Sequence, residues 1–500
     1  MMKAILSKIS NPDSLKAKSL KGSFYLTCGT VIDRGLAFIR NMILTRLLFP
    51  EEMGIMVILL SIIGLFEVLT DVGIKVFVIQ NPRGAELEFL NMTWWFQVVR
   101  GVGLFMAGFL LTPLAFWFFF SSKSDVLTLH SDQEIIMMIR IIFISVLFHG
   151  FMSPASYVLE KELKFSKVVF LNQGTAILGT LLTIGLCFYY KSVWAMIWSY
   201  VIVAGLRSFL SYTVCPFVPK VSVHWHCLNE QLNFTRRMFG LSFLTYLGYN
   251  LDIIILGRLV SAKEVGLYGM AVALAAVSRD LFNKIINPVL LPAFSKKQDQ
   301  REILSIKVMQ ISRYISITGF CFLPFILVFG AKLISLIYGP AYVDASQVFI
   351  LRCFVAFILL HSNILANVLL AKGKPEKHRL FTLVRVLIIG ITIYPMVKKW
   401  GLNGGAISVI SANIVAFLLQ IKVIKKLIGF PEKKYWRQWS SGFLGFCISI
   451  GLALSIREML PENINLSMVF SGLLCGLVFL CYIYNEFGFK HKVISCDENK

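Results

Sequence analysis

Residues 43–56 read ILTRLLFPEEMGIM, and residues 255–268 read ILGRLVSAKEVGLY. Six of the fourteen positions are identical at a constant offset of 212. The shared arginine, glutamate and glycine are Arg46 and Arg258, Glu52 and Glu264, and Gly54 and Gly266. Each copy ends one apolar segment, makes a short polar turn and begins the next. Such an internal repeat predicts two halves of similar structure.

The chain around these copies has the composition of a membrane protein. Of its 500 residues, 57% are hydrophobic and 15% are charged, and the mean hydropathy is +0.74. Soluble proteins carry about 25% charged residues, so a water-soluble enzyme is excluded. A spanning helix needs about 20 apolar residues. Fourteen segments qualify: 22–49, 53–79, 89–120, 134–159, 168–190, 193–215, 239–260, 265–292, 310–338, 346–370, 380–396, 403–421, 438–456 and 467–485.

Six spans precede the second copy of the repeat, and because six is even, the two halves should run parallel. A weaker echo supports this, since SYVLEKELKFSK (156–167) and ANVLLAKGKPEK (366–377) are both basic turns between spans. We therefore predict an all-α polytopic membrane protein of about fourteen helices. The predicted parts are a basic tail (1–21), two six-helix bundles (22–220 and 236–426), an appended helix pair (436–486) and a C-terminal tail (487–500).

The basic residues predict the orientation, because loops rich in Lys and Arg stay in the cytoplasm. If the N-terminus is cytoplasmic, 29 of the 49 basic residues fall in cytoplasmic segments and 6 fall in the outer loops. Both termini are therefore predicted to be cytoplasmic. This placement accounts for the net charge of +22 without a nucleic-acid partner.

The remaining 14 basic residues lie inside the predicted spans, and away from the span ends the acids number only five: Asp33, Glu67, Asp71, Asp252 and Asp280. A charge at the bilayer centre costs about 2.5–3.5 kcal/mol on insertion scales, so these side chains should face protein or a watery cavity. Arg46 and Arg258 close their helices and suit interfacial anchors. Asp71 with Lys75, and Asp280 with Lys284, are four residues apart and suit structural pairs. The excess of cations predicts an anionic ligand.

Several phrases resemble one known family. They are LAFIRNMILTRLLFPEEMG (36–54), FLNMTWWFQVVRG (89–101), SYVLEKELKF, VWAMIWSYV (193–201), YNLDIIILGRLVSAKEVGLYGMA and LPAFSKK. Together they resemble the polysaccharide transporters of the multidrug/oligosaccharidyl-lipid/polysaccharide (MOP) flippase superfamily, and within it the Wzx-type exporters. The resemblance implies V-shaped six-helix bundles around a central cavity. It also implies alternating-access transport of a polyprenyl-pyrophosphate-linked oligosaccharide across the bacterial inner membrane, for O-antigen, capsule or exopolysaccharide assembly.

The candidate substrate-binding residues are cations: Arg34, Arg100, Arg207 and Arg279, which lie nearest the midplane, and Arg40, which lies toward the outer face. Arginine suits a pyrophosphate because its planar fork binds two oxygens at once. Arg40 also matches an arginine that is thought to hold pyrophosphate in lipid II flippases, although Asn41 stands where that relative has an aspartate. Asp252, and after it Asp71, are the candidates for coupling to an ion gradient.

No phosphate loop, metal cluster or cofactor motif is recognisable, so neither ATP hydrolysis nor a cofactor is expected. His224, His226 and Cys227 are too few for a metal site. The alternatives are a lipid II flippase, a multidrug or cation antiporter of the same superfamily, and a membrane-embedded polysaccharide polymerase. The short predicted outer loops disfavour the polymerase. A polymerase and a chain-length regulator would be protein partners of a repeat-unit flippase.

Overall fold

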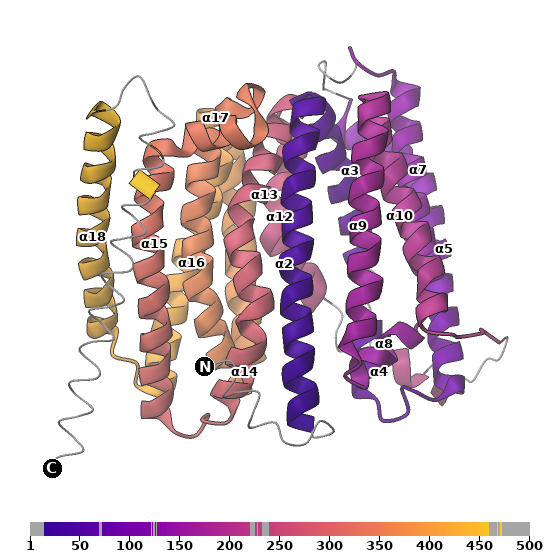
Figure 1. Cartoon of the computed structure of the whole chain (residues 1–500), viewed down its shortest axis with the longest axis horizontal. Coiled ribbons are helices and arrows are strands. Elements are labelled where there is room, and N and C mark those ends of the chain that lie inside the picture. The colour runs from indigo at the N-terminus through magenta and orange to yellow at the C-terminus, as the bar shows by residue number, and fades with distance from the viewer. Residues whose placement is uncertain are drawn as a thin grey trace. The chain divides into compact units, whose positions relative to one another are not determined.

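The computed structural model describes residues 15–459 apart from 70–72, 122, 124–125, 127, 221–225, 228 and 233–239, together with residues 468, 471 and 472. Its regular elements are helices, which confirms the predicted all-α class (Figure 1). They are α2 (Leu15–Leu47), α3 (Pro50–Leu69), α4 (Ile74–Gln80), α5 (Leu87–Phe119), α7 (Asp132–Gly150), α8 (Ala155–Lys161), α9 (Phe165–Tyr190), α10 (Val193–Val214), α12 (Leu241–Leu259), α13 (Ala262–Ile285), α14 (Asn287–Ser295), α15 (Arg301–Tyr338), the 3-10 helix η1 (Pro340–Ala345), α16 (Ser346–Ala371), α17 (Pro375–Ile428) and α18 (Glu432–Met459).

Each predicted span from 22–49 to 438–456 overlaps at least one described helix. Ten helices in the described ranges are long and apolar enough to cross a membrane. One of the ten, α17, covers two predicted spans. Two further predicted spans, 22–49 and 239–260, correspond to α2 and α12. The fourteenth span, 467–485, and the C-terminal tail lie outside the described residues but for three positions, so the number fourteen stays a prediction.

Three apolar runs that predict single spans are interrupted, and one of them, 265–292, divides into α13 and α14. The run 53–79 divides into α3 and α4, and Gly73, which precedes α4, has φ 63°, a left-handed value that glycine adopts without strain. The run 134–159 divides into α7 and α8, and Pro154 lies directly before α8. Proline cannot continue a helical hydrogen-bond ladder. Because a hydropathy window averages over such breaks, the predicted spans are longer than the helices.

The longest helix consists of two spans. Within α17, Trp400 and Gly401 leave the helical conformation, with φ 54° and ψ −136° at Gly401. The break lies between the predicted spans 380–396 and 403–421. Gly404 packs tightly there, because a Cβ on it would lie 2.0 Å from the Met396 carbonyl oxygen.

The chain divides into two compact units, Met1–Gly269 and Met270–Lys500. In the first unit, the two copies of the sequence repeat pack against each other. A Cβ on Gly54 would lie 1.8 Å from the Ala262 carbonyl oxygen, and one on Gly266 would lie 2.0 Å from the Pro50 carbonyl oxygen. Pro50 and Ala262 are themselves 212 positions apart. The starts of α3 and α13 therefore cross symmetrically at glycines. The predicted bundle limits, 22–220 and 236–426, stay predictions.

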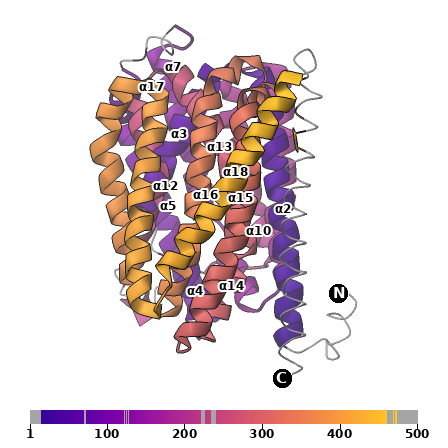
Figure 2. The ribbon, with the colours of Figure 1, turned by 90° about the vertical axis from the view of Figure 1, so that its left-hand side faces the viewer.

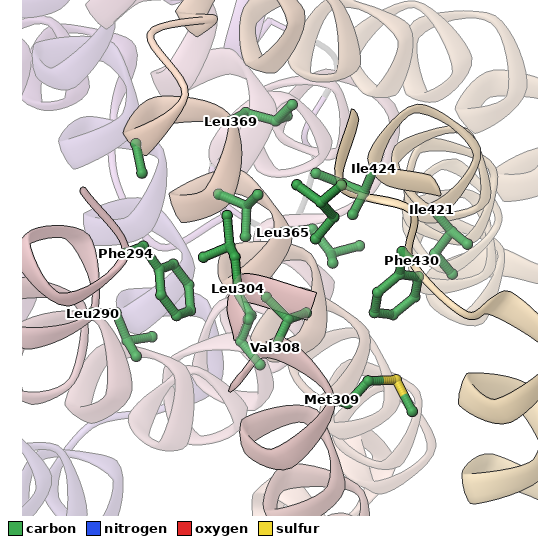
Figure 3. Packing of buried hydrophobic residues seen from close by; sticks show 14 of the residues in the cluster. Leu290, Phe294, Leu304, Val308, Met309, Leu365, Leu369, Ile421, Ile424 and Phe430 are labelled. Atoms are coloured by element: carbon green, nitrogen blue, oxygen red, sulfur yellow. The ribbon is translucent and has the colours of Figure 1, made fainter. Parts of the chain in front are cut away.

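The second unit has its main apolar cluster where α14, α15, α16 and α17 meet (Figure 3). Leu304 and Val308 of α15, Leu369 of α16 and Ile424 of α17 are fully buried in it. Phe430 and Tyr435, which flank the start of α18, belong to the same cluster. From that anchor α18 slants across the outside of the unit along α15 (Figure 2).

Candidate functional site

A polar cavity of about 430 Å³ lies within the first unit. Helices α3, α4, α5, α7, α8, α9 and α10 each contribute side chains to its wall. The polar ones include Glu67, Gln97, Arg100, His149, Asn172 and Arg207. Several of the charges that the sequence buries in apolar helices thus meet around one space, as the cost of exposing them to lipid requires.

Both cavity arginines are positioned by neighbouring helices. Arg100 on α5 donates from Nη2 to the carbonyl oxygen of Glu67 on α3 at 2.8 Å. Arg207 on α10 donates from Nη2 to Oδ1 of Asn172 on α9 at 2.7 Å. The Nε of Arg207 is buried and makes no hydrogen bond in the described part of the chain. Buried donors are nearly always satisfied in native proteins, so this N–H fits a ligand oxygen.

An acid and a histidine form a pair in the same cavity. Nδ1 of His149 on α7 lies 3.0 Å from Oε1 of Glu67, and about a third of each side chain is exposed, 38% for His149 and 32% for Glu67. The side chain of Glu67 thus meets α7, while its carbonyl accepts from Arg100 of α5. This arrangement places a carboxylate–imidazole pair beside a cation.

At the edge of the cavity, Lys75 of α4 and Glu160 of α8 form an ion pair of 2.8 Å. Their charges offset each other. The remaining charged groups of the lining are the two arginines, Arg100 and Arg207, and one carboxylate, Glu67. The lining therefore has a net positive charge that suits an anion.

The structure brings two of the five predicted cations together, Arg100 and Arg207. Arg34 and Arg40 lie on α2 and are not among the residues that line this cavity; Nε of Arg34 is 4.0 Å from Oδ2 of Asp33. Arg279 belongs to the second unit, where it pairs with Asp280 at 3.0 Å.

The structure describes only one of the two predicted coupling acids, Asp252. Asp252 of α12 is only 2% exposed, and its Oδ2 accepts a hydrogen bond from the Tyr268 hydroxyl at 2.7 Å. It does not line the cavity. Asp71 lies outside the described residues, as does His224.

Glu67 and His149 are among the site residues that sequence reasoning did not assign. Glu67 was recognised as an acid inside a span, and that was its only signal. The two are 82 positions apart, and no periodicity connects them. Their proximity results from the packing of α3 against α7.

Comparisons with known proteins place the chain among polysaccharide biosynthesis proteins. The family model described as "Polysaccharide biosynthesis protein" matches residues 43–347. The chain is 25% identical over 458 residues to the lipopolysaccharide biosynthesis protein WzxC of Escherichia coli (strain K12), covering 89% of this chain and 90% of that protein. It is 20% identical to the teichuronic acid biosynthesis protein TuaB of Bacillus subtilis (strain 168), covering 84% and 86%.

Solved structures resemble the fold. The lipid II flippase MurJ, in an inward closed conformation, superposes with a TM-score of 0.76 at 14% identity, over 94% of this chain and 99% of that one. An inward-facing MATE multidrug resistance transporter of the MOP superfamily gives 0.58 at 16% identity, over 79% and 95%. At such identities the likeness concerns the fold alone, and it agrees with the predicted all-α polytopic class.

Proposed function

Because the chain belongs to the polysaccharide biosynthesis protein family, we propose that it is a flippase for lipid-linked oligosaccharides. Its cargo is a polyprenyl-pyrophosphate-linked repeat unit, which it carries across the bacterial inner membrane by alternating access. The product serves O-antigen, capsule or exopolysaccharide assembly. The names of the relatives support this assignment, since they describe lipopolysaccharide and teichuronic acid biosynthesis and, for ExoT of Rhizobium meliloti (strain 1021), succinoglycan transport.

The observation that carries the proposal is the pairing of Arg100 and Arg207 around one cavity. A pyrophosphate presents several anionic oxygens, and arginine forks bind such groups with two parallel hydrogen bonds. The buried Nε of Arg207 supplies a donor for one of these oxygens. Arg34, Arg40 and Arg279 are proposed as further cations along the path of the pyrophosphate.

Transport is proposed to be driven by an ion gradient rather than by chemistry, so the protein acts as a carrier and not as an enzyme. Asp252 and Asp71 remain the coupling acids predicted from the sequence. The Glu67–His149 pair joins them as a candidate, because it shares the cavity with the cations and imidazole is a common proton carrier in proteins.

The orientation follows the distribution of basic residues, with both termini in the cytoplasm. The proposed partners are the lipid-linked oligosaccharide, the bilayer, a polysaccharide polymerase and a chain-length regulator. A lipid II flippase is the second candidate, and the fold likeness to MurJ favours it. The positive excess of the cavity disfavours a cation antiporter.

A pair of complementation experiments separates the two candidates. The chain is expressed in a strain that lacks its own repeat-unit flippase, and separately in a strain depleted of its lipid II flippase. The proposal predicts restored surface polysaccharide in the first strain and no rescue of peptidoglycan synthesis in the second. Rescue of the second strain alone would assign the chain to lipid II.

A further inference from the structure

A glutamine in the wall of the first unit's cavity holds a buried acceptor that the protein does not pair. Gln97 of α5 lines this cavity and is 6% exposed. Its amide nitrogen Nε2 donates to the hydroxyl of Tyr157 on α8 at 3.2 Å. Its carbonyl oxygen Oε1 is buried and makes no hydrogen bond in the part of the chain that the structure describes. Buried polar atoms are paired in most native structures, so this oxygen fits a hydrogen-bond donor of a ligand.

The backbone that carries Gln97 is fixed by a close crossing of α5 and α7. A Cβ on Gly101 of α5 would lie 2.8 Å from the Cα of Gly150 on α7. A Cβ on Gly150 would in turn lie 3.0 Å from the backbone oxygen of Gln97. Such close-packed contacts leave little room for movement. Because the backbone is held at α7 and the amide nitrogen at α8, the unpaired oxygen keeps a defined position.

Gln97 lies beside the cations of the cavity. It is three residues before Arg100, so the two side chains share one face of α5, with Cβ atoms about 5–6 Å apart. Its partner Tyr157 lies within electrostatic range of both Arg100 and Arg207. The wall of the cavity thus holds a neutral acceptor within about one helical turn of a cation.

Two buried atoms of the described lining residues, one on Gln97 and one on Arg207, require opposite partners. Nε of Arg207 is a donor, which an anionic oxygen satisfies, whereas Oε1 of Gln97 is an acceptor. An ionised pyrophosphate offers acceptors only, and a polyprenyl chain offers neither acceptors nor donors. The donors of the proposed cargo are the hydroxyl and amide N–H groups of its sugars. Since Gln97 adjoins Arg100, the donor that reaches it belongs to the sugar attached directly to the pyrophosphate.

We infer that Gln97 recognises the first sugar of the cargo by accepting a hydrogen bond from one of its hydroxyl or amide N–H groups. This role rests on the proposed function, because it requires a sugar pyrophosphate in the cavity. It adds selection of a sugar to the binding of a pyrophosphate, which lipid-linked cargoes have in common. A buried acceptor disfavours a cargo that lacks the matching donor, because the acceptor is then left unsatisfied.

The test measures equilibrium binding to the purified full-length protein by isothermal titration calorimetry. The probes are farnesyl pyrophosphate and farnesyl pyrophosphate linked to N-acetylglucosamine, which share the lipid and the pyrophosphate and differ in the sugar. Gln97→Met keeps the size of the side chain and removes its amide. Gln231→Met is the matched control, because Gln231 is also buried in the first unit, at 2% exposure, and does not line the cavity.

Gln97→Met is expected to bind the sugar-bearing probe about tenfold more weakly than wild type, which is the loss of one hydrogen bond. It should bind the bare pyrophosphate as wild type does, which also shows that the variant is folded. Gln231→Met should match wild type with both probes. An equal loss with both probes would assign the amide to the pyrophosphate, and unchanged binding of the sugar-bearing probe would leave the amide no contact with the cargo; either result overturns the inference. Failure of wild type to bind both probes would contradict the proposed function and, with it, the role of Gln97.

Discussion

Arg207 has a buried donor that its own surroundings leave unsatisfied. Its Nη2 is engaged by Asn172, while its buried Nε makes no hydrogen bond within the described ranges. Leaving such a donor unpaired costs about 1–3 kcal/mol. An anionic oxygen would recover that cost on binding, so the side chain is poised for a ligand rather than for fold stability.

Truncating the cavity arginines should therefore reduce transport more than it reduces stability. A hydrogen bond to a charged group contributes about 1.5–3 kcal/mol, so Arg100→Ala and Arg207→Ala should each lower polysaccharide export by about 10- to 100-fold. Export is measured at matched protein levels in the membrane. Arg83→Ala is the control, because the Arg83 side chain is 42% exposed, pairs with Glu86 at 3.0 Å and does not line the cavity. Unchanged export by both cavity variants would remove the site assignment.

His130, between α5 and α7, makes the stability of the first unit depend on pH. Its Nε2 lies 3.3 Å from Glu52 and its Nδ1 lies 3.3 Å from Glu134. The hydrogen bond with Glu52 raises the pKa of His130 above its ordinary 6.5, and burial opposes this only in part. The raised pKa means that the folded state holds this proton more tightly than the unfolded chain.

The stabilisation from His130 is fully present below pH 6.5 and is lost as the pH rises through the raised pKa. Thermal unfolding of the protein in detergent, followed from pH 5.5 to 8.5, should show a falling midpoint across that window. His130→Gln should flatten this part of the profile. A slope that is the same in the variant would assign the pH dependence to other groups.

At the scale of the elements, the repeat quoted from residues 43–56 and 255–268 marks a close helix crossing. Gly54→Ala and Gly266→Ala should each destabilise the protein by about 1–3 kcal/mol, because the added methyl group would overlap a backbone carbonyl of the other helix. Gly103→Ala in α5 is the matched control. A Cβ there meets nothing within 4 Å, and alanine favours helix, so its unfolding midpoint should not fall. Equal midpoints for all three variants would contradict the crossing.

Much of the element order could be predicted from the sequence, because apolar length alone identifies a spanning helix. The break at Trp400–Gly401 lies in the short polar gap between two predicted spans, and it was found for that reason. The separation of α8 from α7 was missed, because residues 151–154 do not lower the average hydropathy enough. A turn depends on φ and ψ, which a hydropathy window does not contain.

At the scale of the whole molecule, the charges divide into groups with different roles. The 29 basic residues of one set of loops predict the orientation, and those inside the spans predict an anionic cargo. The cost of burying a charge in lipid predicts that Arg100 and Arg207, like the other cations inside the spans, face protein or a cavity. It could not show that Glu67 and His149 join them, because contacts between distant helices depend on packing. The substrate-binding role of the five arginines and the coupling role of Asp252 and Asp71 remain predictions.

The most direct measurement of the central claim is translocation by the purified protein in vesicles. A fluorescent polyprenyl-pyrophosphate-linked oligosaccharide is placed in both leaflets, and the fraction that an added membrane-impermeant quencher reaches is followed over time. The account predicts that wild-type protein makes the protected fraction accessible, and that Arg100→Ala/Arg207→Ala protein does so at least tenfold more slowly. Equal rates for wild type, the double variant and protein-free vesicles would contradict it.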